Sequence, residues 1–239
     1  GWYAPAPEGR DAARVMHASS PDRGLHHLLR VWPAIRRRAP DATLHVYYEI
    51  DRWAALALAY GGWMPEAISA VREVQRHKAR LGVREGVYWR GAVHPQVVVA
   101  DMHRAGVLAY PCDTIFFTEG FGTVPLQAHV AGARVVTTDT DAFREVYGEA
   151  GVIPLASATG EPNPLVERAA VARDFADRVA EAIESMRGRA GWSWRTPHEQ
   201  RTLAERHSWE RVGAMWERVC TGERVWWPDA GGSGVRLAA

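Results

Sequence analysis

Lysine is almost missing from this sequence of 239 residues, since Lys78 is the only one and arginine carries nearly all of the positive charge. The 29 basic residues are balanced by 28 acidic residues, which leaves a net charge of +1. A protein that coats nucleic acid needs a strongly basic surface, so nucleic acid is not expected as a partner. Arginine is the better bidentate ligand for phosphate, although codon usage is the simpler explanation of the bias.

Cysteine and long apolar runs are also scarce. Cys112 and Cys220 lie far apart and match no metal-ligand spacing, which favours a reduced, cytoplasmic setting. No apolar run approaches the ~20 residues of a membrane-spanning helix, and residues 1–12 are unlike a signal peptide. The run Arg36–Arg38 is typical of a solvated helix end and is otherwise a pointer to the inner face of an anionic membrane. Because the sequence also begins without methionine, we expect a fragment or an excised domain.

Metal-binding patterns are missing as well. The ten histidines show no ligand spacing, and neighbours such as His26 and His27 face different directions on a helix. The sequence has no carboxylate pair at ligand spacing either. We therefore expect neither a metal nor another cofactor.

Short β-branched and aromatic segments alternate with amphipathic ones over most of the chain. We expect strands at residues 14–17, 43–48, 87–89, 107–110 and 135–138. Helical patterns occupy residues 25–38, 65–81 and 96–105, a short segment after residue 122, and a turn at 142–147. This alternation predicts parallel βαβ units, whose ligands bind at the carboxyl ends of the strands.

The first helix has a recognisable start and one irregularity. Ser20 is its expected N-cap, directly before Pro21. Apolar residues recur at helical spacing between Leu25 and Ile35, and Pro33 inside this pattern is expected to kink the helix.

The C-terminal part changes character, because residues 165–186 and 199–219 are helical without an intervening strand. The second stretch places Trp209, Trp216 and other apolar residues on one face. The predicted fold class is thus α/β, a Rossmann-like parallel sheet flanked by helices, with a helical C-terminal extension.

The stretch 118–138 reads as a strand end, a glycine turn, a short helix and a second strand. Gly120 and Gly122 allow backbone conformations that let the chain come close to a ligand. Thr123 is the expected cap of the helix, and Pro125 is tolerated in its first turn. The N–H groups at such a helix start attract phosphate.

Glu119 precedes this turn and repels phosphate, but its carboxylate accepts hydrogen bonds from sugar hydroxyls. The alternative is a carboxylate that only complements the helix dipole. The combination with the glycine turn favours a ligand that carries phosphates and hydroxyls side by side.

Several motifs together resemble a known family. They are SSPDRGLHHLL at Ser19–Leu29, WRGAV at Trp89–Val93, AYPC at Ala109–Cys112, EGFGTVPLQAHVAGARVV at Glu119–Val136 and SWERV at Ser208–Val212. In this order they resemble the C-terminal, nucleotide-sugar-binding half of a GT-B fold glycosyltransferase, of the large retaining group 1 type found in bacterial polysaccharide and glycolipid synthesis.

The resemblance implies roles for individual residues. Glu119 would hold the hydroxyls of the donor sugar, and Gln127 stands where the family has a ribose-binding glutamate. Gly91 and Val93 of WRGAV would line the base pocket through their backbone. Gln127 as a plain amide without a binding role is left open.

The family also places two basic residues around its first loop, against the donor diphosphate. Arg23 fits the later one, whereas the earlier one falls near Ala18, which is not basic. Glu119 and Arg23 are thus the candidate catalytic residues, with a solvated Arg23 as the alternative. Donor and phosphate binding is assigned to Ser20, Gly120, Phe121, Gly122 and Thr123.

The implied function is transfer of a sugar from a nucleotide-diphosphate sugar to a glycan or lipid acceptor, with retention. The resemblance divides the chain into a lead-in at 1–13, a donor-binding domain at 14–190, C-terminal helices at 191–224 and a flexible tail at 225–239. A missing N-terminal domain would hold the acceptor. A binding module without catalysis is the alternative, and a dinucleotide-dependent oxidoreductase is a distant third, because GFGTVP has only two of the glycines required.

Overall fold

The structure, a computed structural model, describes residues 9–60, 65–112, 122–140, 143, 152–153, 169–188 and 197–222. Its strands are β1 (Asp11–His17), β2 (Thr43–Tyr47), β3 (Val87–Gly91), β4 (Ala105–Tyr110), β5 (Arg134–Thr138) and β6 (Val152–Ile153). The helices are α1 (Leu25–Arg38), α2 (Ile50–Tyr60), α3 (Pro65–Arg80), α4 (Pro95–Arg104), α5 (Thr123–Ala131), α7 (Ala169–Arg187), α8 (Pro197–Arg206) and α9 (Trp209–Cys220). A single 3-10 turn, η1 (Val83–Glu85), precedes β3.

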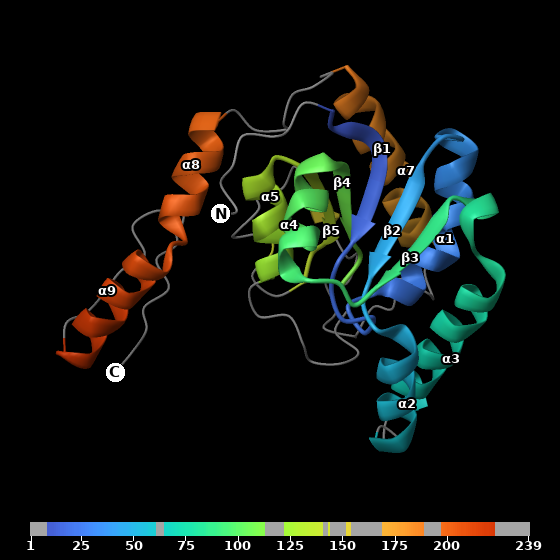
Figure 1. Cartoon of the computed structure of the whole chain (residues 1–239), viewed down its shortest axis with the longest axis horizontal. Helices are drawn as coiled ribbons and strands as arrows, with labels where there is room; N and C mark the ends of the chain where they lie inside the picture. Colours follow the sequence, from blue (N-terminus) through green and yellow to red (C-terminus); the bar gives the residue numbers. More distant parts are fainter. Residues whose placement is uncertain are drawn as a thin grey trace.

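The strands form one parallel sheet in the order β3-β2-β1-β4-β5-β6. From β1 the chain adds β2 and β3 on one side of the sheet, and it then adds β4, β5 and β6 on the other side. The pair β1 and β4 is therefore the topological switch point, where doubly wound folds bind ligands. Every residue of β4 is buried, which explains why Ala105–Tyr110 is a continuous run of small and apolar residues. In Figure 1 the strand arrows point towards the end of the molecule where α2 and α3 project.

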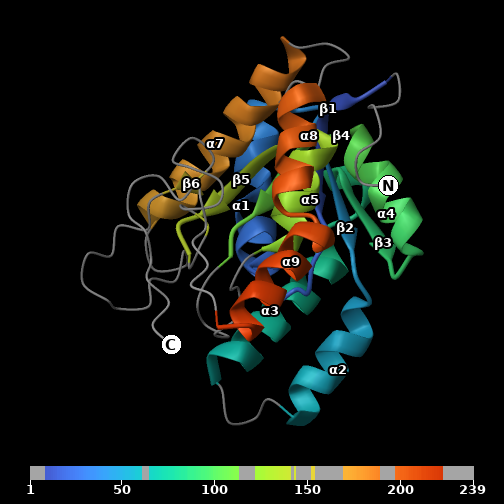
Figure 2. The ribbon, with the colours of Figure 1, turned by 90° about the vertical axis from the view of Figure 1, so that its left-hand side faces the viewer.

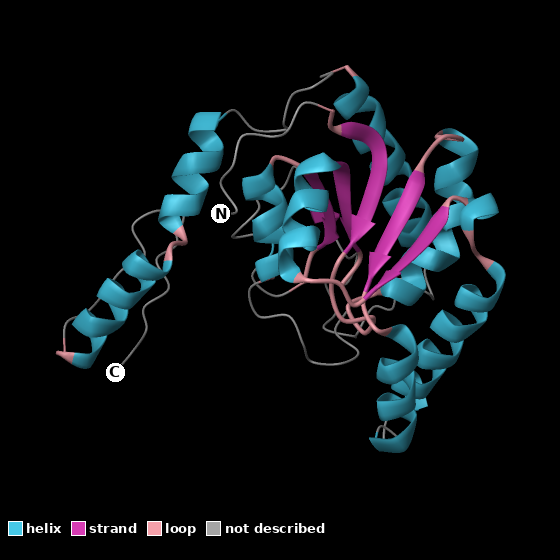
Figure 3. Cartoon of the chain, in the orientation of Figure 1, coloured by secondary structure: helices cyan, strands magenta, loops and turns pink. Residues whose placement is uncertain are grey.

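Helices cover both faces of the sheet. Helices α1 and α7 pack together on one face and share an apolar core that includes Val15, Trp32 and Phe175. Helices α4 and α5 pack on the other face, over a second core that includes Met102 and Leu108. Figure 2 shows α7 and α4 on opposite sides of the sheet, and Figure 3 shows the strands between the helices. The predicted α/β class with a Rossmann-like parallel sheet is confirmed.

Several local predictions need correction. The sheet also contains β6, which is only Val152–Ile153 and too short to leave a pattern in the sequence. The predicted helix at 199–219 is interrupted at His207, because the Ser208 hydroxyl accepts a hydrogen bond from the N–H of Arg211 at 3.2 Å and caps a new helix. Helix α1 includes Pro33, whose side chain is exposed, and the kink expected at this residue stays a prediction.

The C-terminal helices extend from the α5 side of the sheet. Helix α8 contacts α5, whereas α9 has no buried residue. The predicted turn at 142–147 lies outside the described residues except for Phe143. None of the helices in the described ranges combines the length and the apolar character needed to cross a bilayer.

Candidate functional site

Two loops meet at the switch point of the sheet. The Ser19 hydroxyl, just after β1, lies 3.2 Å from the Tyr110 hydroxyl at the end of β4. Gly24, before α1, has φ +83°, and a Cβ on it would lie 1.7 Å from the carbonyl oxygen of Pro111. The turn between β1 and α1 therefore packs directly against the segment that leaves β4, and only glycine allows this approach.

The start of α1 differs from the prediction. Gly24, and not Ser20, is the N-cap, because residues 21–24 form an extra turn in which the N–H of Leu25 donates to the Pro21 carbonyl at 3.1 Å. The Ser20 hydroxyl instead donates a hydrogen bond to the carboxylate of Asp22. Ser20 thus lies in the loop after β1, where an anion could approach it, but it does not cap the helix.

Arg23 lies in the same turn, and its guanidinium forms an ion pair with Asp22. The side chains of Arg23 and Asp22 are 20% and 16% exposed. Sequence reasoning missed the role of Asp22, although adjacent opposite charges in SSPDRG were visible. An anion that binds Arg23 must compete with this carboxylate.

The start of α5 is also shifted by one residue from the prediction. Gly122, with φ +71°, is the N-cap, and Thr123 is the first helical residue and is exposed. Pro125 occupies the first turn as predicted, and the N–H of Leu126 donates to the Gly122 carbonyl at 3.1 Å. Gln127 lies one turn after Thr123 on the same side of α5 and is half-buried.

Glu119, Gly120 and Phe121 lie outside the described residues. The predicted crevice shared by Glu119 and the start of α5 is therefore untested. The roles assigned to these three residues remain predictions.

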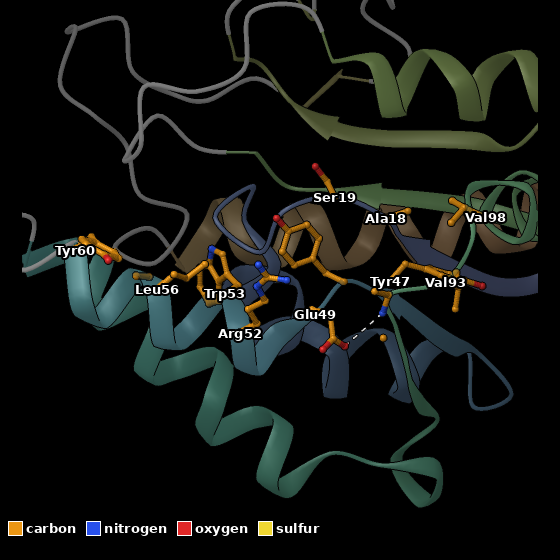
Figure 4. A pocket seen from close by; sticks show the side chains of 14 residues that line it. Ala18, Ser19, Tyr47, Glu49, Arg52, Trp53, Leu56, Tyr60, Val93 and Val98 are labelled. Atoms are coloured by element: carbon orange, nitrogen blue, oxygen red, sulfur yellow. Dashed lines mark hydrogen bonds between the residues drawn. The ribbon is translucent and has the colours of Figure 1, made fainter.

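A pocket of about 870 Å³ opens at the carboxyl ends of β1, β2 and β3. This volume falls within the range of ~300–1,000 Å³ typical of small-molecule sites. The strand ends and following loops contribute Ala18, Ser19, Tyr47, Tyr48, Glu49, Gly91, Ala92 and Val93, and Val98 comes from α4. Helix α2 contributes Arg52, Trp53, Leu56, Ala57 and Tyr60 (Figure 4).

The pocket includes some predicted site residues and not others. Gly91 and Val93, predicted to line a base pocket, border it together with Ser19. The other described candidates are not among its lining residues: Ser20, Arg23, Gly122, Thr123 and Gln127. The predicted residues therefore divide between this pocket, the turn after β1 and the start of α5.

Helix α2 was not predicted from the sequence. Its apolar residues Trp53, Leu56 and Tyr60 recur at helical spacing, and Asp51 lies in its first turn, so the signal was present. This helix forms one wall of the pocket.

A buried carboxylate, Asp101, connects α4 to the strands beneath the pocket. Asp101, 4% exposed on α4, accepts hydrogen bonds from the Tyr47 hydroxyl at 2.5 Å and from Arg14 at 3.0 Å. Burial and the hydrogen bond to Asp101 raise the pKa of Tyr47 to about 12, so this phenol stays protonated. These bonds join α4 to β1 and β2, and an ion pair of 3.7 Å between Asp101 and Arg90 joins α4 to β3, which ends at Gly91.

His17, the last residue of β1, has no exposed surface and stacks on Tyr110 with ring centroids 5.9 Å apart. Burial lowers its pKa to about 4. The ring is therefore neutral at pH 7 and supports the turn above it without adding charge.

Known proteins share this sequence pattern and this fold. A sequence profile described as "Glycosyl transferases group 1" matches residues 13–185. A GDP-mannose-dependent alpha-(1-6)-phosphatidylinositol monomannoside mannosyltransferase from Mycolicibacterium smegmatis is 27% identical over 220 residues, which covers 81% of this chain and 50% of that protein. The chain thus spans about half the length of this curated relative.

Solved structures of glycosyltransferases have the same fold at low sequence identity. The pneumococcal O-GlcNAc transferase GtfA, in complex with UDP and GlcNAc, matches with a TM-score of 0.60 and 15% identity over 92% of this chain and 37% of that one. Anabaena Alr3699/HepE, in complex with UDP, matches with a TM-score of 0.60 and 17% identity over 89% of this chain and 49% of that one. The profile covers well over half of the sequence, and the chain therefore belongs to the group 1 family of glycosyl transferases.

Proposed function

We propose that the chain is the donor-binding half of a retaining glycosyltransferase that transfers a sugar from a nucleotide-diphosphate sugar to a glycan or lipid acceptor. The observation that carries this proposal is the meeting of two loops at the switch point, through the Ser19–Tyr110 and Gly24–Pro111 contacts. The turn with Ser20 and Arg23 thus lies beside Pro111, where the chain leaves β4.

The leaving diphosphate needs stabilisation as the bond from the sugar to its oxygen breaks. Arg23 supplies a positive charge, and the first turn of α5, with N–H groups of Thr123 and Val124 that lack intrahelical partners, supplies hydrogen-bond donors and the positive end of the helix dipole. Asp22 opposes this role, because it already holds Arg23. Binding of the diphosphate would release the carboxylate into water. We expect no metal to be needed.

Glu119 is proposed to hold the hydroxyls of the sugar, so that the reacting carbon stays aligned with the acceptor. Gln127, half-buried on α5 one turn beyond Thr123, is proposed to contact the ribose. Retention of configuration is proposed from family membership alone.

The acceptor would be held mainly by a preceding domain, as the coverage of about half of the curated relative suggests. Helix α9 supports this proposal, because its Trp209 and Trp216 side chains are 85% and 64% exposed. Two exposed tryptophans on one amphipathic helix suit a surface that packs on another domain. Polysaccharide or glycolipid synthesis in the cytoplasm, at the inner face of the membrane, is the proposed setting.

A calorimetric titration of the chain with UDP, GDP, ADP and NAD tests the proposal. We expect at least one of the three nucleoside diphosphates to bind, and Arg23→Ala to weaken that binding by about tenfold, because a charge-assisted hydrogen bond contributes ~1.5–3 kcal/mol. Arg178→Ala, on the exposed surface of α7, is the control and should bind normally. Binding of NAD alone would instead favour the dinucleotide-dependent oxidoreductase.

The alternative function is a nucleotide-sugar-binding module without catalysis. It is favoured by the share of the relative that the chain covers, since half of a two-domain enzyme binds donor without an acceptor site. Product formation by residues 1–239 and by a longer chain that includes the preceding sequence separates the two. Transfer by the longer chain supports the enzyme, and donor binding without transfer by either chain supports the module.

A further inference from the structure

The pocket beside α2 has a partly aromatic lining. Four aromatic side chains border it: Tyr47, Tyr48, Trp53 and Tyr60. Trp53 is half-buried and packs against the core, so its ring is held in place, whereas Tyr60 is 76% exposed at the outer end. Flat aromatic faces of this kind stack on nucleobases.

Two charged side chains, Glu49 and Arg52, are among the described residues that line this pocket. They lie three residues apart at the start of α2, a spacing that permits an ion pair, yet no such pair forms between them. Glu49 instead accepts a long hydrogen bond of 3.4 Å from the N–H of Ala92, after β3. In Figure 4 a dashed line marks this hydrogen bond of Glu49, and Arg52 lies beside Trp53.

The two charged groups therefore keep most of their hydrogen-bonding capacity. A carboxylate accepts about four hydrogen bonds, and in the described part of the chain the Glu49 carboxylate accepts one, the long bond from Ala92. The guanidinium of Arg52 makes no hydrogen bond or ion pair within the described part of the chain. An acceptor and a multiple donor thus lie beside an aromatic surface, in the pocket that also contains Gly91 and Val93.

We propose that this pocket selects guanine, with Glu49 as the residue that determines the base. Guanine has two adjacent N–H donors, at N1 and at the 2-amino group, that pair with both oxygens of one carboxylate. Its O6 and N7 acceptors suit arginine, here Arg52. This inference rests on the proposed function, since it names the base of the donor that the site would bind.

The other bases fit this pair of residues less well. Uracil has a single N–H between two carbonyl oxygens, and a carboxylate that approaches it meets at least one of them. Adenine and cytosine place a ring acceptor next to their amino group, which again faces the carboxylate with a lone pair. The carboxylate therefore disfavours all three bases relative to guanine.

Titration calorimetry with GDP, IDP, UDP and ADP tests the inference. We expect GDP to bind at least about tenfold more tightly than UDP or ADP, since ~1.4 kcal/mol corresponds to tenfold. IDP lacks the 2-amino group and should bind more weakly than GDP. Glu49→Gln should remove most of the preference for GDP, because guanine loses a charged partner for its two N–H groups. UDP should bind at least as tightly as before, because the repulsion between the carboxylate and the uracil carbonyl oxygens is gone.

Glu181→Gln is the matched control, because Glu181 is exposed on the far helix α7 and the change in charge is the same. Equal binding of GDP and UDP, unchanged by Glu49→Gln, would overturn the guanine inference and leave the proposed function in place. Binding of none of the nucleoside diphosphates would overturn both. Circular dichroism of Glu49→Gln checks that the exposed substitution leaves the fold intact.

Discussion

Asp22 controls how strongly the turn after β1 can bind an anion. Its carboxylate accepts a hydrogen bond from Ser20 and pairs with Arg23, so the two phosphate ligands predicted in this turn are already occupied by one side chain. A diphosphate that enters this turn must displace that carboxylate and overcome its negative charge.

Asp22→Asn should therefore raise the affinity for inorganic pyrophosphate and for nucleoside diphosphates. Since a partly exposed ion pair contributes up to about 1 kcal/mol, we expect an increase of roughly twofold to fivefold in calorimetry. Asp51→Asn is the control, because Asp51 is 78% exposed and forms an ion pair with Lys78 away from the turn. A weaker affinity in Asp22→Asn would show that Asp22 helps to build the site.

His17 links the stability of the same region to pH. Its pKa falls from 6.5 to about 4 because the ring is buried. Between these two values the unfolded chain binds the proton more readily than the folded chain does, so the stabilising contribution is complete above pH 6.5 and is lost as the pH falls towards 4.

His17→Gln should make the free energy of unfolding less dependent on pH between 6.5 and 4. The shift of the pKa to about 4 corresponds to a difference on the order of 3 kcal/mol over this window. Urea unfolding at several pH values measures it for both proteins. If the free energy of unfolding changes with pH in the same way in both proteins between pH 6.5 and 4, this explanation of His17 is wrong.

At the level of elements, the contact between the turn before α1 and the end of β4 can be tested with a matched pair of glycines. Gly24 and Gly222 both have φ +83°, but a Cβ on Gly24 would overlap the Pro111 carbonyl, whereas one on Gly222 would meet nothing within 4 Å. Gly24→Ala should destabilise the protein by about 2–5 kcal/mol, and Gly222→Ala by no more than about 1–2 kcal/mol. Equal losses in thermal denaturation would mean that the two elements are not in close contact.

Tryptophans allow a similar comparison between α1 and α9. Trp32 is 1% exposed and its indole N–H donates to the Glu85 carbonyl at 2.8 Å, whereas Trp216 is 64% exposed. Trp32→Ala should cost about 3–5 kcal/mol of the free energy of unfolding, and Trp216→Ala less than about 0.5 kcal/mol. A large loss from Trp216→Ala would place α9 against the rest of the chain and remove it as a free surface for another domain.

For the molecule as a whole, the periodicity of the sequence was sufficient for the sheet and most helices, since buried strands such as β4 and amphipathic helices such as α1 leave strong patterns. Exact helix starts were not predictable. At α1 and α5 a glycine takes the place of the predicted Ser20 and Thr123 caps, because the cap residue has a positive φ that residues with a Cβ rarely adopt.

The site could be predicted only in part for a related reason. Gly91 and Val93 belong to a motif and do border the pocket, whereas Asp22 and the wall formed by α2 depend on contacts between side chains that no motif records. The pairing of Arg23 with Asp22 depends on the conformation of one turn. Such choices are decided by tertiary packing, which periodicity does not reveal.

The central claim is that a nucleotide-diphosphate sugar spans the carboxyl edge of the sheet, from the pocket beside α2 to the switch point. A crystal structure of the chain with the nucleoside diphosphate that binds best tests it most directly. We predict the base beside Trp53 and Gly91, and the diphosphate between Arg23 and the N–H groups at Thr123. A nucleotide bound elsewhere, or a diphosphate without contact to either the turn after β1 or the start of α5, would contradict the account.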